Sequence, residues 1–359
     1  KDMNLQDFES VVSLLERDPK TATDHIMEFR ENPDALQLCH DWICLPECSP
    51  TSKFQLALVL QYNTLKHWSS LNEDIINALR ESLWTLITNS IHNNDMPPFA
   101  LNKIIQVYVL LWKRGWKDMA AEHRESLFNN VSSFLSSSQQ NGNGSSEGII
   151  NPSAFRFGTI LLRALVEEFN YRNMGGITLP LEFHETSHES FESIGLSECL
   201  TLSIRCLGDS FQSLDDSDNI NYDISPITES VKLFMETMNW TFVDTDKNST
   251  DANRLKLNLL SGNNDSSNTC LSLPRSWTSV IVQIDMIQGM FQIYARTRER
   301  LFKLCVLQTD ASNSGGNAFH QMMNTAASSD RAKKSNCEKE CVACLEQLRN
   351  LMICMSSVS

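Results

Sequence analysis

The chain has 359 residues, of which 41% are hydrophobic and 21% are charged, so it is globular material and wholesale disorder is excluded. Glycine and proline number only 13 and 10, and this scarcity of turn residues argues against all-β sandwiches and barrels and against a glycine-rich nucleotide fold. The formal net charge of −14 would repel nucleic-acid phosphates, so we expect protein partners and no nucleic-acid binding.

Membrane insertion and secretion are both unexpected. No apolar run reaches the ~18 residues that a membrane span needs. The N-terminal stretch KDMNLQDFES is polar and acidic, unlike a signal peptide. We therefore expect the 11 cysteines to be reduced thiols in the cytosol or nucleus, several of them buried as small hydrophobic side chains.

Apolar residues recur at helical spacing along nearly the whole chain. The first stripe consists of Phe8, Val11, Val12 and Leu15. The helix that follows Ser49-Pro50 is apolar on more than one face, so we expect neighbouring helices to enclose it. In chain order, helices are predicted over residues 21–31, 34–45, 52–68, 72–92, 98–115, 120–137, 152–169, 196–214, 224–240, 277–307 and 337–355.

Several helix starts carry a local signal. Asn72 is placed to cap the helix that follows it, and prolines open the helices at Pro50, Pro98 and Pro152. The exception to the helical pattern is residues 179–183, where apolar and other residues alternate and predict a brief extended piece.

The fold class that these patterns predict is all-α, a right-handed α-solenoid of about five HEAT-type antiparallel helix pairs. Long helices begin near residues 52, 98, 152 and 224, close to the spacing of about 40–47 residues in HEAT repeats. An ordinary helical bundle is the alternative, since no internal similarity marks a repeat. The expected organisation is HEAT-type pairs at 1–138, a flexible loop at 139–150, further pairs at 151–243, a disordered insert at 244–270, a long helical segment at 271–308, a second disordered insert at 309–336 and a terminal helix at 337–359.

A resemblance to a known family is carried by stretches that occur in order along residues 21–296. They are TATDHIMEFRENPDALQLCHDWI (21–43), LLWKRGWKD (110–118), NPSAFRFGTILLRALVEEF (151–169), LPLEFHETSHESFE (179–192), NWTF (239–242) and LPRSWTSVIVQIDMIQGMFQIYAR (273–296). Together they resemble the helical hairpins of karyopherin-β nuclear transport receptors, in the branch of exportin-4 and exportin-7. The LEFH and NWTF stretches resemble exportin-4 more than exportin-7.

The resemblance implies the N-terminal portion of a nuclear export receptor, which is not an enzyme and shuttles between nucleus and cytoplasm through the nuclear pore. Its implied partners are Ran-GTP, the GTP form of the small GTPase Ran, a protein cargo such as a translation or transcription factor, and Phe-Gly nucleoporins. No cofactor and no membrane are expected. The alternative is a generic helical-repeat scaffold for protein–protein binding, or an importin-type adaptor.

The family also implies where Ran would bind. Its first hairpins hold Ran on their second helices, which correspond to residues 34–45, 72–92 and 120–137. Helix phase then gives the polar positions opposite each apolar stripe, and we expect these to face Ran. They are Gln37, Asp41, Asn77, Glu81, Thr85, Glu125 and Asn129.

Residues 184–188 read His-Glu-Thr-Ser-His, the spacing of a zinc metallopeptidase motif in which two histidines one helical turn apart bind the metal. The motif needs a helix, but the residues before it alternate like an extended segment. A third ligand would have to be a carboxylate such as Glu198. We therefore predict no metal here and keep a zinc metallopeptidase acting through His184, Glu185 and His188 as an alternative.

Two cysteine clusters could also suggest zinc. Cys39, His40, Cys44 and Cys48 lie close in sequence, as do Cys337, Cys341 and Cys344, but paired C-x₂-C units at a fixed distance are missing. Their helical spacing favours packing, and core packing is also expected for the seven tryptophans. The basic pair at residues 113–114 is expected on a solvated helix face.

Overall fold

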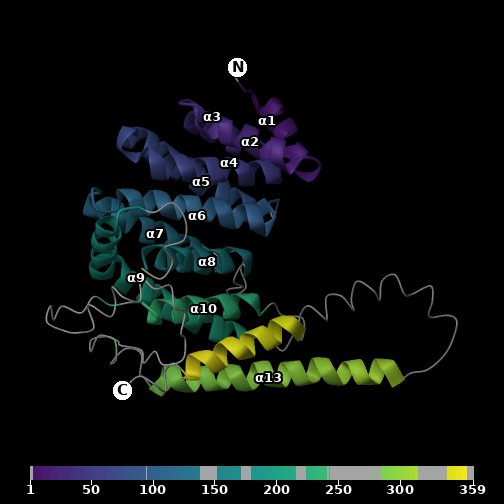
Figure 1. Cartoon of the computed structure of the whole chain (residues 1–359). Coiled ribbons are helices and arrows are strands. Elements are labelled where there is room, and N and C mark those ends of the chain that lie inside the picture. The colour runs from purple at the N-terminus through teal and green to yellow at the C-terminus, as the bar shows by residue number, and fades with distance from the viewer. Residues whose placement is uncertain are drawn as a thin grey trace. The chain divides into compact units, whose positions relative to one another are not determined.

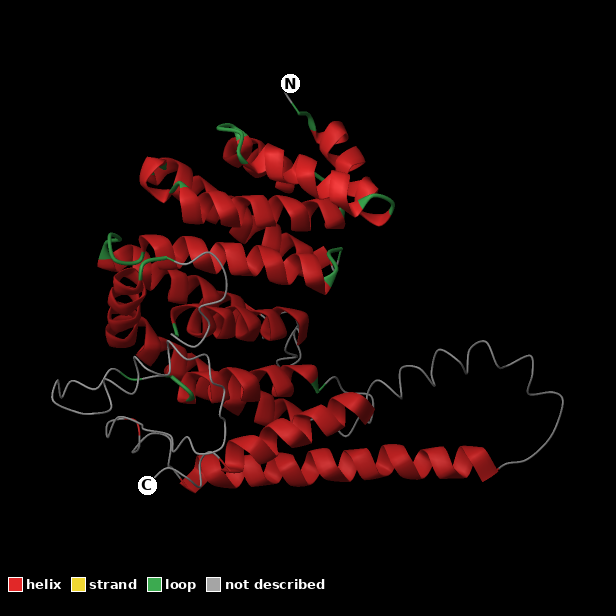
Figure 2. Cartoon of the chain, viewed as in Figure 1, coloured by secondary structure: helices red, strands yellow, loops and turns green. Residues whose placement is uncertain are grey.

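The structure is a computed structural model that describes residues 3–93, 95–137, 152–170, 179–215, 224–240, 242, 277, 284–313 and 338–353. Every regular element within these ranges is a helix (Figure 2), and the all-α prediction is confirmed for them. The helices are α1 (Leu5–Ser13), η1 (Leu14–Glu16), α2 (Pro19–Arg30), α3 (Ala35–Ile43), α4 (Pro50–Lys66), η2 (Trp68–Ser70), α5 (Glu73–Asn93), α6 (Pro98–Gly115), α7 (Ala121–Ser137), α8 (Pro152–Phe169), α9 (Leu181–Asp215), α10 (Ser225–Met238), α13 (Ile284–Asn313) and a helical segment at 338–353.

The helix starts follow from local side chains. Asn72 Oδ1 accepts from the backbone N–H of Ile75 at 2.8 Å, and Ser49 Oγ accepts from that of Ser52 at 3.2 Å, so both expected starts are confirmed. Caps of this kind stabilise a helix by about 1 kcal/mol each. Asn4 and Asp18 cap α1 and α2 in the same way, and prolines begin α2, α4, α6 and α8.

The chain divides into two compact units. The first consists of Lys1–Asn129 with Ala164–Gly195, and the second of Asn130–Arg163 with Leu196–Ser359.

In the first unit, α4 is enclosed by α1, α3 and α6, and α5 packs against α6. Figure 1 shows α4 and α6 side by side. The enclosure of the helix after Ser49-Pro50 is therefore confirmed. Its Leu56 and Leu60 are almost wholly buried. At the start of the unit, Phe8, Phe29 and Trp42 join α1, α2 and α3, and the rings of Phe29 and Trp42 stack with centroids 5.7 Å apart.

A second aromatic cluster of the first unit surrounds Trp116, which is wholly buried just after α6. Its ring lies 5.3 Å from those of Phe169 and Phe191, which stack on each other at 4.2 Å, and 6.3 Å from Phe128. Aromatic contacts of this type add about 0.5–1.5 kcal/mol each beyond the area they bury. The cluster thus fixes the C-terminal end of α6 against α7, α8 and α9.

The second unit has an apolar core built from α9, α10, α13 and the helical segment at 338–353. Phe234 of α10 and Met290 of α13 lie within it. Cys341 and Cys344 are wholly buried in the same cluster, which confirms packing as their role. Arg163 and Glu229 form an ion pair at 3.1 Å beside this core.

The expected loop at 139–150 and the insert at 244–270 lie outside the described residues. The insert predicted at 309–336 is wrong in its first part, because α13 continues to Asn313. The sequence there is polar, but its first glycine is Gly315, so nothing in it breaks the helix. A polar run without a glycine or proline is compatible with a helix as well as with disorder. The rest of this insert, up to residue 336, lies outside the described residues.

Candidate partner-binding surface

The three helices expected to face Ran are present as α3, α5 and α7, with ends within two residues of the predicted ones. We call the seven polar residues predicted on them the polar set. All seven are exposed, on the first unit of the chain, while the apolar stripes of the same helices are buried. The polar set consists of Gln37, Asp41, Asn77, Glu81, Thr85, Glu125 and Asn129.

His40 connects the members of the polar set on α3 with α5. Its Nε2 lies 2.8 Å from the hydroxyl of Ser82, the residue after Glu81, and its Nδ1 lies 3.3 Å from Asp41 Oδ1. Gln37 Nε2 donates to the same carboxylate oxygen at 2.8 Å. Gln37 and His40 thus orient the Asp41 carboxylate, and the contact between His40 and Ser82 joins α3 to α5 beside Glu81.

Asn77 is hydrogen-bonded to Arg80, a buried arginine of α5 that also bonds α6. Arg80 Nη1 donates to Asn77 Oδ1 at 3.0 Å, and Arg80 Nη2 donates to the carbonyl of Leu111 at 2.8 Å. Its guanidinium lies 4.9 Å from the ring centroid of Trp112, and burial lowers the pKa of Arg80 to about 10, so it stays charged. The spacing Ile76, Arg80, Leu83 is that of a buried stripe, and this signal could have identified Arg80 from the sequence.

The α7 members are less closely connected. Glu125 and Asn129 are exposed, and no hydrogen bond or ion pair within the described part of the chain links them to α3 or α5. With Asp41 and Glu81, Glu125 makes the polar set acidic. Such a surface suits a partner that presents Lys or Arg side chains.

The structure overturns the reason for rejecting the zinc motif. Residues 179–183 are not an extended piece leading into the motif, because α9 begins at Leu181 and the carbonyl of Pro180 accepts from the N–H groups of Phe183 and His184. His184 and His188 therefore lie one helical turn apart, as a zinc motif requires. Three apolar residues at alternate positions were too short a pattern to distinguish a strand from a helix start.

The surroundings of these histidines nevertheless disfavour a cation. His188 is wholly buried, and burial, with a smaller effect of Lys113, lowers its pKa to about 3. Burial, together with Lys113 and Arg114, lowers the pKa of His184 to about 4. Both rings are thus neutral near pH 7, and positive charge faces them. Among the described residues, no group of three His, Cys, Asp or Glu side chains could hold a metal ion.

Lys113 and Arg114 do not form the solvated basic face expected from the sequence. Lys113 is buried and its ammonium donates to the carbonyl of Glu168 and, at 3.3 Å, to the Glu168 carboxylate. The Arg114 guanidinium lies 5.3 Å from the ring of Trp68 and 4.9 Å from that of Phe183. Long basic side chains pack their stems and heads on aromatic rings in this way, which charge counting along a sequence misses.

Two of the three thiols of the first cysteine cluster are packed in the interior. Cys39 and Cys48 are buried free thiols and Cys44 is exposed. Burial raises the pKa of Cys48 to about 12, so it is a protonated thiol near pH 7. Trp42, Trp112, Trp116 and Trp240 are buried, in agreement with the packing role predicted for tryptophan, whereas Trp68, Trp84 and Trp277 are partly exposed.

Comparisons with known proteins do not place the chain in a family. No protein-family model matches the sequence, and no curated protein matches it. Within the described ranges, no helix has the length and apolar character needed to cross a bilayer.

Proposed function

We propose that this protein is a right-handed HEAT-type α-solenoid that binds other proteins and is not an enzyme. The observation that carries the proposal is the packing order of the first unit. There, helices pack against near neighbours in the chain, α3 on α4, α4 on α6 and α5 on α6, as in a stack of helix pairs. Such a stack exposes a long surface, and its exposed polar positions are available to a partner.

Within this class, the resemblance to exportin-4 supports a nuclear export receptor. The partner proposed for the polar set is Ran-GTP. Protein cargo and Phe-Gly nucleoporins are the other proposed partners, and the proposed location is the nucleus and the cytoplasm. The support from the chain itself is that all seven residues expected to face Ran are exposed, and that three of them are acidic.

The test is binding of the purified chain to Ran loaded with GTP or with GDP. We expect tighter binding to the GTP form, and weaker binding as salt rises, because exposed charges are screened beyond about 8 Å at physiological ionic strength. Reversing two charges of the polar set, in Asp41→Lys with Glu81→Lys, should weaken binding without changing helicity.

The matched control reverses two exposed acidic residues of α2, in Asp24→Lys with Glu28→Lys. This variant has the same change in net charge, so it should bind Ran-GTP like the parent. Equal binding of both nucleotide states by folded protein at low salt would remove Ran from the proposal. A loss of binding that is the same in both double variants would show a general charge effect instead of a site.

A further inference from the structure

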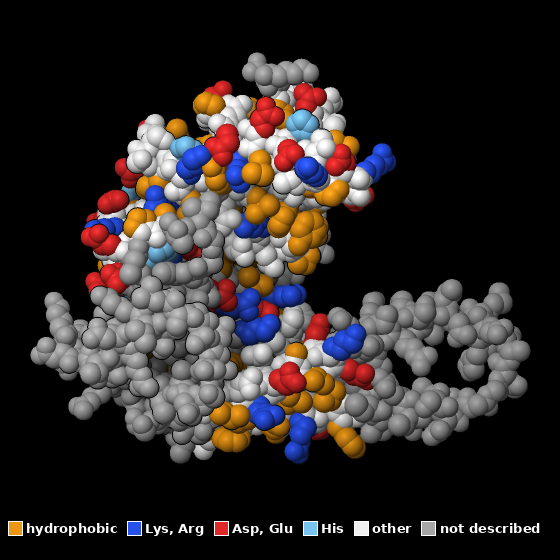
Figure 3. Space-filling model, in the orientation of Figure 1, with side chains coloured by type: hydrophobic (Ala, Val, Ile, Leu, Met, Phe, Trp, Pro, Cys, Tyr) orange, Lys and Arg blue, Asp and Glu red, His pale blue; other side chains and the backbone are white. Residues whose placement is uncertain are grey.

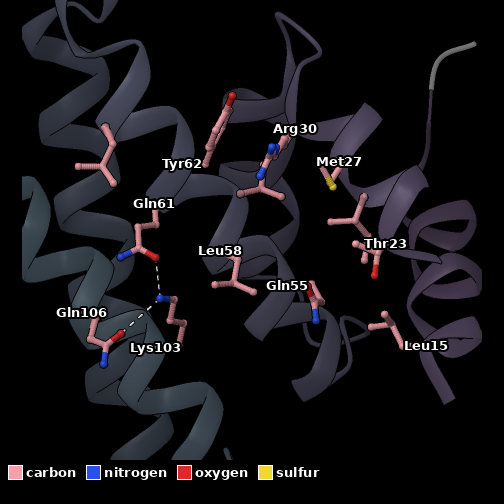
Figure 4. Close-up of a pocket in the computed structure, with 13 residues that line it drawn as sticks. Leu15, Thr23, Met27, Arg30, Gln55, Leu58, Gln61, Tyr62, Lys103 and Gln106 are labelled. Carbon is pink, nitrogen blue, oxygen red and sulfur yellow. Dashed lines mark hydrogen bonds between the residues drawn. The ribbon is translucent and has the colours of Figure 1, made fainter. Parts of the chain in front are cut away.

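A groove crosses the first unit between η1, α2, α4 and α6, on helices other than those of the polar set. It has a volume of about 590 Å³, within the range of about 300–1,000 Å³ that is usual for ligand sites. Figure 4 shows its side chains pointing into the same space from α2, α4 and α6. We call it the α2–α4–α6 groove.

Apolar side chains form much of the lining. Ile26 and Met27 come from α2, and Leu58 and Leu65 come from α4. The side chain of Met27 is 45% exposed, although it belongs to the groove. Figure 3 shows hydrophobic side chains gathered on the surface over α4 and α6. Exposed apolar groups that converge on a hollow are typical of binding sites, and methionine adapts its shape to different side chains.

One cation of the groove lacks a negative partner. Lys103 Nζ donates to Gln61 Oε1 at 2.6 Å and to Gln106 Oε1 at 3.3 Å, and both acceptors are neutral amides (Figure 4). No ion pair joins Lys103 to a carboxylate in the described part of the chain. Burial lowers the pKa of Lys103, with a smaller opposing effect of Glu168, whose carboxylate is bonded to Lys113. An ammonium in this setting gains more from a carboxylate than from amide oxygens.

The other charged residue that lines the groove, Arg30, is also positive. The Arg30 guanidinium lies 4.0 Å from the ring centroid of Tyr62, and both residues line the groove. Glu31 is outside the lining, where it pairs with Arg30 at 3.5 Å and with Lys66 at 2.6 Å. The lining thus has two cations and no carboxylate, in a chain whose net charge is −14. The groove is a local exception to the acidic character of the protein.

We infer that the α2–α4–α6 groove binds a short peptide segment of a partner protein in which one carboxylate is flanked by apolar side chains. The carboxylate bonds Lys103 Nζ and displaces one of its amide acceptors. The apolar side chains of the peptide pack on Met27 and Leu58. Gln55 and Gln106, which line the groove, supply amide groups for the peptide backbone. The inference does not depend on Ran, because it concerns a different set of helices.

The test uses the whole chain and an array of octapeptides. Each peptide contains one Glu and three residues drawn from Leu, Met and Phe, in every order, with Ser elsewhere. A matched array has Gln in place of Glu. We expect a subset of Glu peptides to bind saturably in fluorescence anisotropy, and the Gln versions of those peptides to bind about tenfold more weakly, the usual effect of losing one charge-assisted hydrogen bond.

Three variants locate the effect. Lys103→Gln should lower the affinity for the Glu peptides about tenfold and bind the Glu and Gln versions equally. Lys117→Gln removes the charge of an exposed lysine outside the groove and should change affinity less than twofold. Met27→Ala should lower the affinity for the Glu peptides and for the Gln peptides by the same factor. Because Met27 is exposed, this variant remains folded. The inference is overturned if no peptide binds, if the two arrays bind equally to the parent chain, or if folded Lys103→Gln still distinguishes them.

Discussion

The buried histidine of α9 makes protein stability depend on pH in a way that separates packing from metal binding. The pKa of His188 is lowered from 6.5 to about 3, first by burial and then by Lys113. Glu192 Oε2 is 3.9 Å from His188 Nδ1 and partly exposed, so its attraction does not offset the burial. Since the folded pKa lies below the unfolded one, protonation of this histidine opposes folding. The free energy of unfolding is therefore at its full value above about pH 6.5 and decreases as the pH falls toward about 3.

The size of the effect follows from the unfolded pKa. At about pH 5 the unfolded histidine is protonated and the folded one is not, which removes about 2 kcal/mol from the free energy of unfolding relative to about pH 7.5. In His188→Gln the group cannot titrate, so this variant should lose about 2 kcal/mol less than the parent over the same pH interval.

The assay is urea unfolding followed by circular dichroism at the two pH values. The control is His123→Gln, which replaces an exposed histidine of α7. The free energy of unfolding of this variant should change with pH by the same amount as that of the parent. Stoichiometric zinc should leave the unfolding midpoint of the parent unchanged. A His188→Gln variant that keeps the full pH dependence would show that His188 is not the group responsible. A rise in midpoint with zinc that disappears in His184→Ala would establish the metal site instead.

Three further stability predictions concern packing. Gly195→Ala should lower the free energy of unfolding by about 1–3 kcal/mol, because the added methyl carbon would lie 2.7 Å from the Phe191 ring. Gly208→Ala should raise it by about 0.4–1 kcal/mol, because nothing lies within 4 Å of the added methyl carbon. Urea unfolding that shows both alanine variants shifted in the same direction would contradict the packing around Gly195. Arg80→Met should lower the free energy of unfolding by about 1–3 kcal/mol, since it removes the hydrogen bonds from the guanidinium to the Leu111 carbonyl and to Asn77, and an unchanged midpoint would contradict the anchoring role. Trp116→Ala should cost about 3–5 kcal/mol in the same assay, and a loss below about 1 kcal/mol would show that the cluster is not a core.

Much of the fold could be predicted from the sequence because helix signals are local. The caps at Ser49 and Asn72 and the proline starts depend on residues within one turn, and the apolar stripes give the buried faces. The predicted C-terminal end of α13 was wrong, because a polar run without a glycine is compatible with both a helix and a loop. The predicted start of α9 was wrong, because an alternation of five residues, 179–183, is too short to distinguish a strand from the first turn of a helix.

The details of the site depended on contacts between distant residues, which the sequence does not specify. Lys113 is buried because Glu168, 55 positions later, bonds its ammonium. His40 is oriented by Ser82, 42 positions later. The exposure of the polar set could be predicted because it follows from helix phase alone. The groove could not, since its lining combines residues from four elements that no motif connects.

Binding of Ran-GTP at the exposed polar positions of α3, α5 and α7 is the proposed function of this surface. Site-specific photocrosslinking tests it most directly, with a photoreactive amino acid placed at Glu81 of α5 or, as a control, at Glu28 of α2. Both positions are exposed, so neither substitution should disturb folding. We expect a crosslink from position 81 to GTP-loaded Ran, little with GDP-loaded Ran, and none from position 28. Crosslinks from position 28 alone, or equal crosslinks from both positions, would contradict it.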